Sequence, residues 1–224
     1  MRLSIVATPI GNLEDITLRA IRTLKEADII LAEDTRVGAK LLAHLEISGK
    51  TVWRYDEHAH EKIMPKIIEA LKQDKNIALT TDAGTPGISD PGSRLVGYLL
   101  KQFSDLKIEA IPGPSAMAAA VSVSGFPMEE FVFLGFPPHK KGRETFFKNL
   151  AGEERAVVFY ESPHRIIKTL ESLAKLQPER RAVVCRELTK QFETISRGTI
   201  LEILEKVKSE PIKGEFVVVL APLF

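Results

Sequence analysis

The stretch TTDAGTPGISDPG, residues 80–92, places three glycines, two prolines and two aspartates between an apolar run and an amphipathic one. The apolar run, NIALT at 76–80, has the length and composition of a buried strand. A strand, an irregular loop and an amphipathic segment in succession are typical of an α/β fold with parallel strands. In such sheets ligands bind beyond the carboxyl ends of the strands. The stretch therefore predicts a parallel sheet and a ligand-binding loop at its edge.

The same alternation runs through the whole N-terminal half. The predicted strands there are 3–7, 28–33, 51–55, 76–80 and 107–111. Between them, apolar side chains recur at helical spacing, for example at Ile16, Ala20 and Leu24. A further helix over 61–73 contains Pro65, which we expect only in the first turn of a helix.

After IPGP at 111–114 the pattern restarts with less regular spacing. The predicted strands of this half are 131–135, 156–160, 181–185, 192–196 and 216–220. Too few residues separate the third and fourth of these strands for a crossover helix, so part of the second sheet is predicted to be antiparallel. The sequence thus predicts two α/β domains, 1–112 with a mainly parallel sheet and 113–224 with a mixed sheet.

Composition narrows the class of protein. With 44% hydrophobic and 27% charged residues the chain is typical of globular proteins, and no apolar run approaches the roughly 18 residues of a membrane span. The apolar start of the chain is too short for a secretory signal, so we expect a cytoplasmic protein. The net charge of +1 gives no global attraction to nucleic acid. The single cysteine, Cys185, excludes an internal disulfide and is interpreted as a buried thiol.

Several predicted strand ends carry small or acidic residues, in TPIGNLED, EDTR and PGPSA as well as in the stretch quoted first. None of these loops has the Gly-Lys-Ser/Thr or G-x-G-x-x-G pattern of a phosphate cradle. Gly84 and Gly87 permit close backbone approach, and Asp82 and Asp90 offer acceptors to hydroxyl and ammonium groups. A nucleoside carrying an amino acid fits these loops. The alternative is that Asp90 is only a turn former and Asp82 a loop cap.

Seven motifs in order carry a resemblance to a known family: ATPIGNLEDIT, AEDTR, TDAGTPGISDPG, IPGPSA, FYESPHR, CRELTK and KGEFVVV. Together they resemble the tetrapyrrole-methylase superfamily, and within it the ribosomal RNA small subunit methyltransferase I branch. The resemblance extends from residue 4 to about residue 220, nearly the whole chain. Longer members of the branch continue into a small helical segment after the last strand, which this sequence lacks.

The resemblance implies a homodimer with S-adenosylmethionine in a cleft between two α/β domains. It implies methyl transfer to the ribose 2′-hydroxyl of a decoding-centre cytidine, 1402 in the usual numbering of 16S rRNA, within the small ribosomal subunit. The cofactor-binding positions that it implies are Pro9, Asp82, Ala83, Gly84, Thr85, Ile88, Ser115, Ala116, Tyr160, Glu161, Leu188 and Glu215.

Methyl transfer from a sulfonium releases a neutral thioether, so it requires no metal and no general acid. A positioned base would help to remove the hydroxyl proton. We favour Asp34, with Glu33 beside it, because AEDTR follows a predicted strand directly; Glu161 and His164 are further candidates. Arg36 is placed to meet a phosphate. The alternative for Asp34 is an N-cap of the following helix.

The segment GFPPHKKGRE, 135–144, is either an exposed linker or a mobile basic flap on ribosomal RNA. The predicted RNA contacts are Arg36, Lys140, Lys141, Arg143, His164 and Arg165.

Two motifs suggest other chemistry. ESPHR at 161–165 is interpreted as a helix start, with Ser162 as N-cap and Pro163 in the first position, rather than as a hydrolase site. His58 and His60 lack further metal ligands nearby, so we predict no metal. Two other functions remain open at this point: methylation of a tetrapyrrole precursor, and a non-catalytic role in ribosome assembly.

Overall fold

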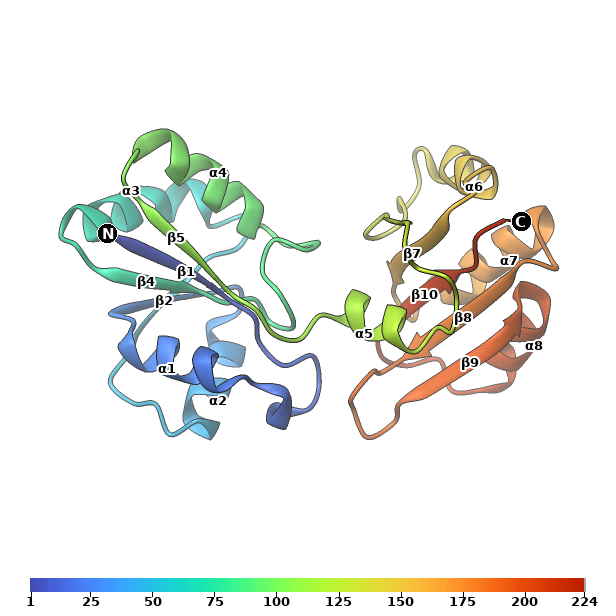
Figure 1. The fold of residues 1–224 in the computed structure, drawn as a ribbon, viewed down its shortest axis with the longest axis horizontal. Coiled ribbons are helices and arrows are strands. Elements are labelled where there is room, and N and C mark those ends of the chain that lie inside the picture. The colour runs from blue at the N-terminus through green and yellow to red at the C-terminus, as the bar shows by residue number, and fades with distance from the viewer. Residues whose placement is uncertain (224) are drawn as a thin grey trace. The chain divides into compact units, whose positions relative to one another are not determined.

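The computed structural model describes residues 1–223 and divides into two compact units (Figure 1). The first unit spans Met1–Ser115 and the second begins at Ala116. Each unit contains one five-stranded sheet with helices packed against it. The sequence-based boundary between folding domains, at residues 112 and 113, stays a prediction.

The first unit contains a five-stranded sheet that is parallel, as predicted. Its strand order is β3-β2-β4-β1-β5. Its strands are β1 (Arg2–Val6), β2 (Ile29–Ala32), β3 (Thr51–Arg54), β4 (Asn76–Leu79) and β5 (Lys107–Ile111). The helical segments are η1 (Leu13–Asp15), α1 (Leu18–Glu26), α2 (Thr35–His44), α3 (His60–Lys72) and α4 (Gly92–Gln102). Because all five strands run in one direction, their carboxyl ends lie along a single edge.

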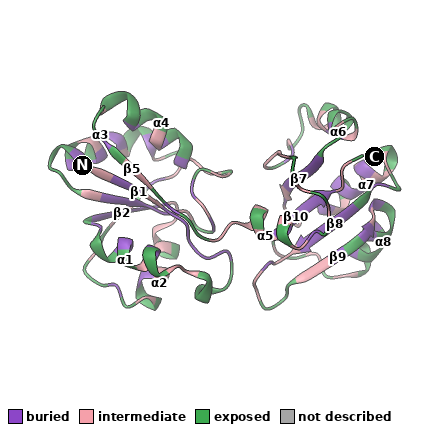
Figure 2. Ribbon diagram, viewed as in Figure 1, coloured by how far each residue is buried: buried purple, intermediate pink, exposed green. Residues whose placement is uncertain are grey.

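Two apolar layers sandwich this sheet. Along β4, Ile77 and Leu79 point into the layer with α3 and α4, whereas Ala78 points into the layer with α1 and α2. This alternation follows from the two-residue repeat of a strand. Figure 2 shows the strands buried between helices whose outer faces are exposed. Strands covered on both faces have continuous apolar sequences, which explains why their positions could be predicted from the sequence.

Helix α3 differs from the prediction at Pro65. The helix begins at His60, so Pro65 is its sixth residue and lies beyond the first turn. Proline cannot donate to the carbonyl four residues earlier, which here is Glu61. Both Pro65 and Glu61 are exposed, so water can satisfy that carbonyl and the apolar side of the helix stays packed.

The second unit contains a mixed sheet with strand order β6-β7-β10-β8-β9. Its elements are α5 (Ala116–Ser122), β6 (Phe131–Phe133), α6 (Arg143–Ala151), β7 (Ala156–Glu161), α7 (Ile166–Leu176), β8 (Arg181–Arg186), β9 (Thr194–Thr199), α8 (Ile200–Ser209) and β10 (Phe216–Leu220). Only β6 and β7 pair in parallel, whereas β10 is antiparallel to both of its neighbours. The predicted antiparallel pairing of β8 with β9 is confirmed.

Two local predictions in this unit have different outcomes. Cys185 on β8 is fully buried, as predicted, and burial raises the pKa of its thiol to about 11. The predicted helix start at Ser162 is wrong, because α7 begins at Ile166 after a turn. The hydroxyl of Ser162 accepts a bond from the side chain of Arg165 instead of capping a helix. Within residues 1–223, no helix has the length and apolar character that crossing a bilayer demands.

Candidate functional site

The loops after β1 and β4 are joined at the carboxyl edge of the parallel sheet. The Thr8 amide donates to the Gly84 carbonyl at 2.9 Å, and the Gly84 amide donates back to Thr8 at 3.0 Å. The Thr8 hydroxyl also donates to the carbonyl of Thr81 at 3.1 Å. These bonds bring the predicted cofactor residue Pro9, which follows Thr8, to the 80–92 loop. This role of Thr8 could not be predicted from the sequence, because a threonine after a strand is common.

The loop after β5 joins the same group. The Thr85 hydroxyl donates to the carbonyl of Pro114 at 3.0 Å, next to the predicted cofactor residue Ser115. Gly84 has a φ of +87°, and a side chain there would begin 3.3 Å from Ile10. A Cβ on Gly113 would lie only 3.0 Å from the Cβ of Ala7. Glycine at both positions therefore allows three backbone loops to approach closely.

Asp90 shapes the 80–92 loop. Its carboxylate accepts the Gly87 amide at 2.8 Å and the Gly92 amide at 2.7 Å. A Cβ at Gly92 would lie 2.8 Å from the Gly87 nitrogen, so no side chain fits there without a shift. The turn-forming alternative for Asp90 is therefore confirmed.

Asp82 connects the loops after β4 and β2. Its carboxylate accepts the Asp34 amide at 2.9 Å, and the neighbouring Thr81 hydroxyl donates to Glu33 at 2.7 Å. Partial burial raises the pKa of Asp82, and the nearby charges of Glu33 and Asp34 add to the rise. Three predicted carboxylates thus meet at one place on the sheet edge.

Asp34 is the N-cap of α2, the alternative that its position suggested. Its carboxylate accepts the Arg36 amide at 2.8 Å, and the Arg36 guanidinium contacts both carboxylate oxygens, with Nε at 3.0 and 3.1 Å. These bonds hold the pKa of Asp34 well below its usual range. The side chain of Arg36 is 86% exposed, so its outer face is open to a phosphate.

In the second unit, Tyr160 lies at the end of β7 beside the start of α5. Its hydroxyl accepts the Met117 amide at 3.2 Å, one residue after the predicted cofactor residue Ala116. The rings of Phe133 and Phe136 lie edge-on to it, with centroids 5.0 and 5.5 Å away.

Leu188 follows the end of β8, and Glu215 precedes the start of β10, the strand that pairs with β8. The Glu187 amide donates to the carbonyl of Glu215 at 2.9 Å, and Lys190 contacts both Glu187 and Glu215 at 2.8 Å. Leu188, which follows Glu187 in the chain, is buried. Lys190 was not among the site residues predicted from the sequence, although it is the last residue of the CRELTK motif.

Glu161 is buried, and its carboxylate is shared among protein donors. It contacts Arg165 at 2.8 Å, Thr169 at 2.5 Å and Arg143 at 3.8 Å. Two of the predicted RNA contacts, Arg143 and Arg165, therefore face Glu161, whereas Lys140, Lys141 and His164 are exposed.

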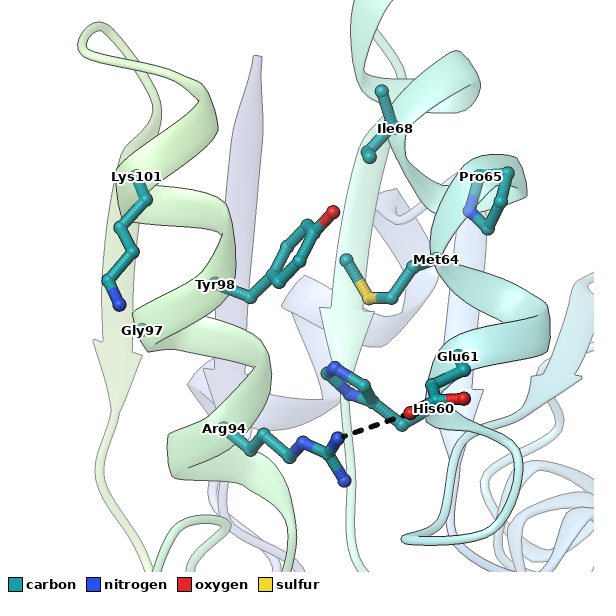
Figure 3. A pocket seen from close by; sticks show the side chains of 9 residues that line it. All are labelled: His60, Glu61, Met64, Pro65, Ile68, Arg94, Gly97, Tyr98 and Lys101. Carbon is teal, nitrogen blue, oxygen red and sulfur yellow. Dashed lines mark ion pairs between the residues drawn. The ribbon is translucent and has the colours of Figure 1, made fainter.

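A separate hollow of about 560 Å³ lies between α3 and α4 (Figure 3). His60 lines it, with Nδ1 2.8 Å from the Tyr55 hydroxyl, and its ring lies edge-on to Tyr98. Burial raises the pKa of Tyr55 to about 12 and lowers that of His60. None of the residues selected from the sequence as binding or catalytic lines this hollow. Residues 1–223 contain no cluster of three or more potential metal ligands.

The fold and the loops at the carboxyl edge of the parallel sheet define a class of protein. A parallel sheet whose strand-end loops are joined by hydrogen bonds, followed by a mixed sheet, defines a two-unit α/β protein, and in parallel sheets strand-end loops are where ligands bind. The chain belongs to the family of tetrapyrrole (corrin/porphyrin) methylases, whose model matches residues 2–204.

Curated relatives cover nearly the whole chain, and their printed name is ribosomal RNA small subunit methyltransferase I. The one from Hydrogenobaculum sp. is 45% identical over 99% of this chain and 96% of the relative. The one from Thermotoga maritima is 42% identical over 98% of both. The one from Halalkalibacterium halodurans is 46% identical over 96% of this chain and 73% of the relative. The family resemblance seen in the sequence is confirmed.

Solved structures agree on the fold. A diphthine synthase superposes with a TM-score of 0.75 at 16% identity, over 99% of this chain and 90% of that one. A uroporphyrin-III C-methyltransferase from Thermus thermophilus superposes with a TM-score of 0.67 at 18% identity, over 98% and 94%. At such identities the likeness concerns the fold alone.

Proposed function

We propose that this chain methylates small-subunit ribosomal RNA with S-adenosylmethionine, at the ribose 2′-hydroxyl of the decoding-centre cytidine. The observation that carries the proposal is the 42–46% identity to ribosomal RNA small subunit methyltransferase I proteins over nearly the full chain. The tied loops at the edge of the parallel sheet support it, because they contain most of the predicted cofactor positions of the first unit. The homodimer and the cytoplasmic location stay predictions.

The strand-end loops fit the cofactor. Methylases of this family use S-adenosylmethionine, which presents ribose hydroxyls, an ammonium group and an adenine. Gly84 and Gly87 have positive φ, which glycine adopts without strain, and the exposed Gly87 leaves room where a side chain would otherwise stand. The exposed Asp82 offers a carboxylate to hydroxyl or ammonium donors. We propose that these loops of the first unit bind the cofactor, whereas Ala116, Tyr160, Leu188 and Glu215 of the second unit stay predicted cofactor positions.

The protein's own task is to position the hydroxyl and to accept its proton. The cofactor supplies a methyl group on a sulfonium, and the departing thioether is neutral. Most of the rate should therefore come from orientation, which can lower a barrier by several kcal/mol. A positioned base adds to this as the hydroxyl loses its proton.

We propose Asp34 as that base, under the control of Arg36. With the guanidinium on its carboxylate, Asp34 is a weak base. A phosphate of the RNA that draws the exposed Arg36 away would raise the proton affinity of Asp34. Glu33 and Asp82 lie beside it and are the next candidates.

The variant Asp34→Asn tests this assignment. Asparagine caps a helix about as well as aspartate, so α2 should keep its start. We expect single-turnover methylation to fall by roughly 10²–10⁴-fold, with the cofactor Kd nearly unchanged. Rapid-quench kinetics at saturating cofactor would measure the chemical step. A chemical rate equal to that of the wild type would exclude Asp34, and the same substitution at Asp82 would be measured next.

The proposed function itself is tested with methyl-labelled cofactor. Incubation with small ribosomal subunits should label RNA, and the labelled nucleotide should resist alkaline hydrolysis because a 2′-O-methyl group blocks attack on the adjacent phosphodiester. Naked ribosomal RNA and a tetrapyrrole precursor are the parallel substrates. Label in the tetrapyrrole would support the other enzyme, and saturable RNA binding without any transfer would support an assembly factor.

A further inference from the structure

We propose that Glu161 is a positioning residue that clamps the basic segment 137–142 in place for RNA recognition. Four side chains form this Glu161 clamp: Arg143, Glu161, Arg165 and Thr169. The RNA part of the inference rests on the proposed function, whereas the clamp itself rests on the contacts of the second unit.

The carboxylate of Glu161 has no exposed side-chain surface. Removing a charge from water is costly unless opposite charges and hydrogen bonds replace the water. Here Oε1 accepts the Ser162 amide at 2.8 Å and contacts Arg165 at 2.8 Å. Oε2 accepts the Thr169 hydroxyl at 2.5 Å and lies 3.8 Å from Arg143. Both oxygens are thus occupied by protein donors, which leaves Glu161 little capacity to bind the cofactor through its carboxylate.

Each arginine of the clamp also donates one hydrogen bond to the basic segment. Arg165 donates to the carbonyl of Pro137 at 2.9 Å, and Arg143 donates to the carbonyl of Pro138 at 3.1 Å. Arg143 also donates to Thr169 at 2.6 Å and lies 4.9 Å from the ring of Phe147. One buried carboxylate therefore orients two guanidinium groups, and these hold two consecutive prolines whose φ angles are already restricted.

The segment is also held at its far end. Arg143 is the first residue of α6, and its amide donates to the carbonyl of Lys140 at 3.2 Å, closing a turn. Gly142 enters the helix with a φ of +82°. The exposed tip between these anchors contains His139, Lys140 and Lys141.

This arrangement differs from a mobile flap. Lysines on a loop that is ordered before binding lose less conformational freedom when they contact phosphate. Phe136, which precedes the clamped prolines, is 53% exposed and rests edge-on against Tyr160. An exposed aromatic ring beside cationic side chains suits an unpaired nucleotide, whose base can stack while its phosphate meets a lysine.

The variants Glu161→Gln and Thr169→Val test the clamp in the full chain. Both should release the backbone of the segment from its anchors, so tryptic cleavage after Lys140 or Lys141 should become about tenfold faster, as read by mass spectrometry. Thr169→Val removes the hydroxyl without changing the carboxylate, and it serves if Glu161→Gln does not fold. Thr169→Ser should restore wild-type cleavage. The matched control is Glu144→Gln, which removes an exposed charge next to Arg143 without touching the clamp.

The same variants report on RNA. Glu161→Gln and Thr169→Val should raise the KM for small subunits by about tenfold while leaving the cofactor Kd within about twofold. The double variant Lys140→Ala with Lys141→Ala should raise the same KM and lower the salt slope of RNA binding by about one per lost phosphate contact. Adding Glu161→Gln to this double variant should cause no further rise, because all three changes act on one contact.

Distinct outcomes would overturn the inference. Unchanged cleavage in both clamp variants would exclude the clamp, even if the wild type methylates no RNA. A weaker cofactor Kd with an unchanged KM for subunits would assign Glu161 to the cofactor instead. Full additivity with the lysine variants would show that Glu161 acts elsewhere. Absence of methyl transfer by the wild type would instead count against the proposed function, and filter binding of RNA would then replace KM in the comparison.

Discussion

Replacing Gly92 by alanine is expected to weaken cofactor binding about tenfold or more and to destabilise the first unit by about 1–3 kcal/mol. A Cβ at this position would lie 2.8 Å from the Gly87 nitrogen and 2.9 Å from the Asp90 carboxylate. The bonds from Asp90 to the amides of Gly87 and Gly92 would have to open, and these bonds shape the 80–92 loop. Calorimetric titration with S-adenosylmethionine measures the first effect, and denaturation followed by Trp53 fluorescence measures the second.

The matched control for this variant is the same substitution five residues later in α4. A Cβ on Gly97 would meet no atom within 4 Å, and the residue is exposed. Alanine there should raise the free energy of unfolding by about 0.5–1 kcal/mol, because glycine loses more backbone entropy in a helix. Equal cofactor affinity in the two variants would contradict the role assigned to the 80–92 loop.

Replacing Arg180 by methionine is expected to lower the free energy of unfolding of the second unit by about 3–5 kcal/mol. Arg180 is 6% exposed and donates to five oxygens. Its main-chain acceptors are the carbonyls of Ala221, Leu150, Glu153 and Arg155, and its side-chain acceptor is Gln177. Methionine fills much of the same space but donates nothing, so the buried carbonyl of Leu150 and three partly buried carbonyls would lose their partner.

The neighbouring Arg181 provides the control, because it is exposed. Arg181→Met should change the free energy of unfolding by less than about 0.5 kcal/mol. Hydrogen exchange of the amides in β8 and β10 is the appropriate measurement, since the only tryptophan, Trp53, belongs to the first unit. Wild-type protection of β8 in Arg180→Met would show that water or neighbouring groups replace the guanidinium completely.

Much of the fold could be predicted because its signals are local. Strands buried on both faces, such as Val157–Phe159 in β7, are continuous apolar runs whatever lies next to them. The short connection between β8 and β9 excludes a crossover helix on length alone. A ligand-binding edge was predicted on similar grounds, because parallel strands place their carboxyl ends along one edge of the sheet.

The local predictions that proved wrong depended on contacts that residue spacing alone does not specify. Pro65 lies in the second turn of α3 because tertiary packing of the apolar face outweighs one missing hydrogen bond. Ser162 does not cap a helix because the guanidinium of Arg165, oriented by Glu161, takes its hydroxyl. Neither the packing of α3 nor the bond from Arg165 to Ser162 can be predicted from spacing along the chain.

The sequence by itself determined the class of fold and the family, since these depend on periodicity and ordered motifs, and from loop composition it predicted the edge at which a ligand would bind. Only the tertiary structure decided what each polar side chain does there. Asp90 holds two amides, Asp34 is bound by Arg36, and Glu161 holds the arginines expected on RNA. The physical reason is that hydrogen bonds and ion pairs act over about 3 Å in space. Which groups come that close depends on the folded path of the loops and on packing, and residue spacing along the chain does not specify it, even for neighbours such as Asp34 and Arg36.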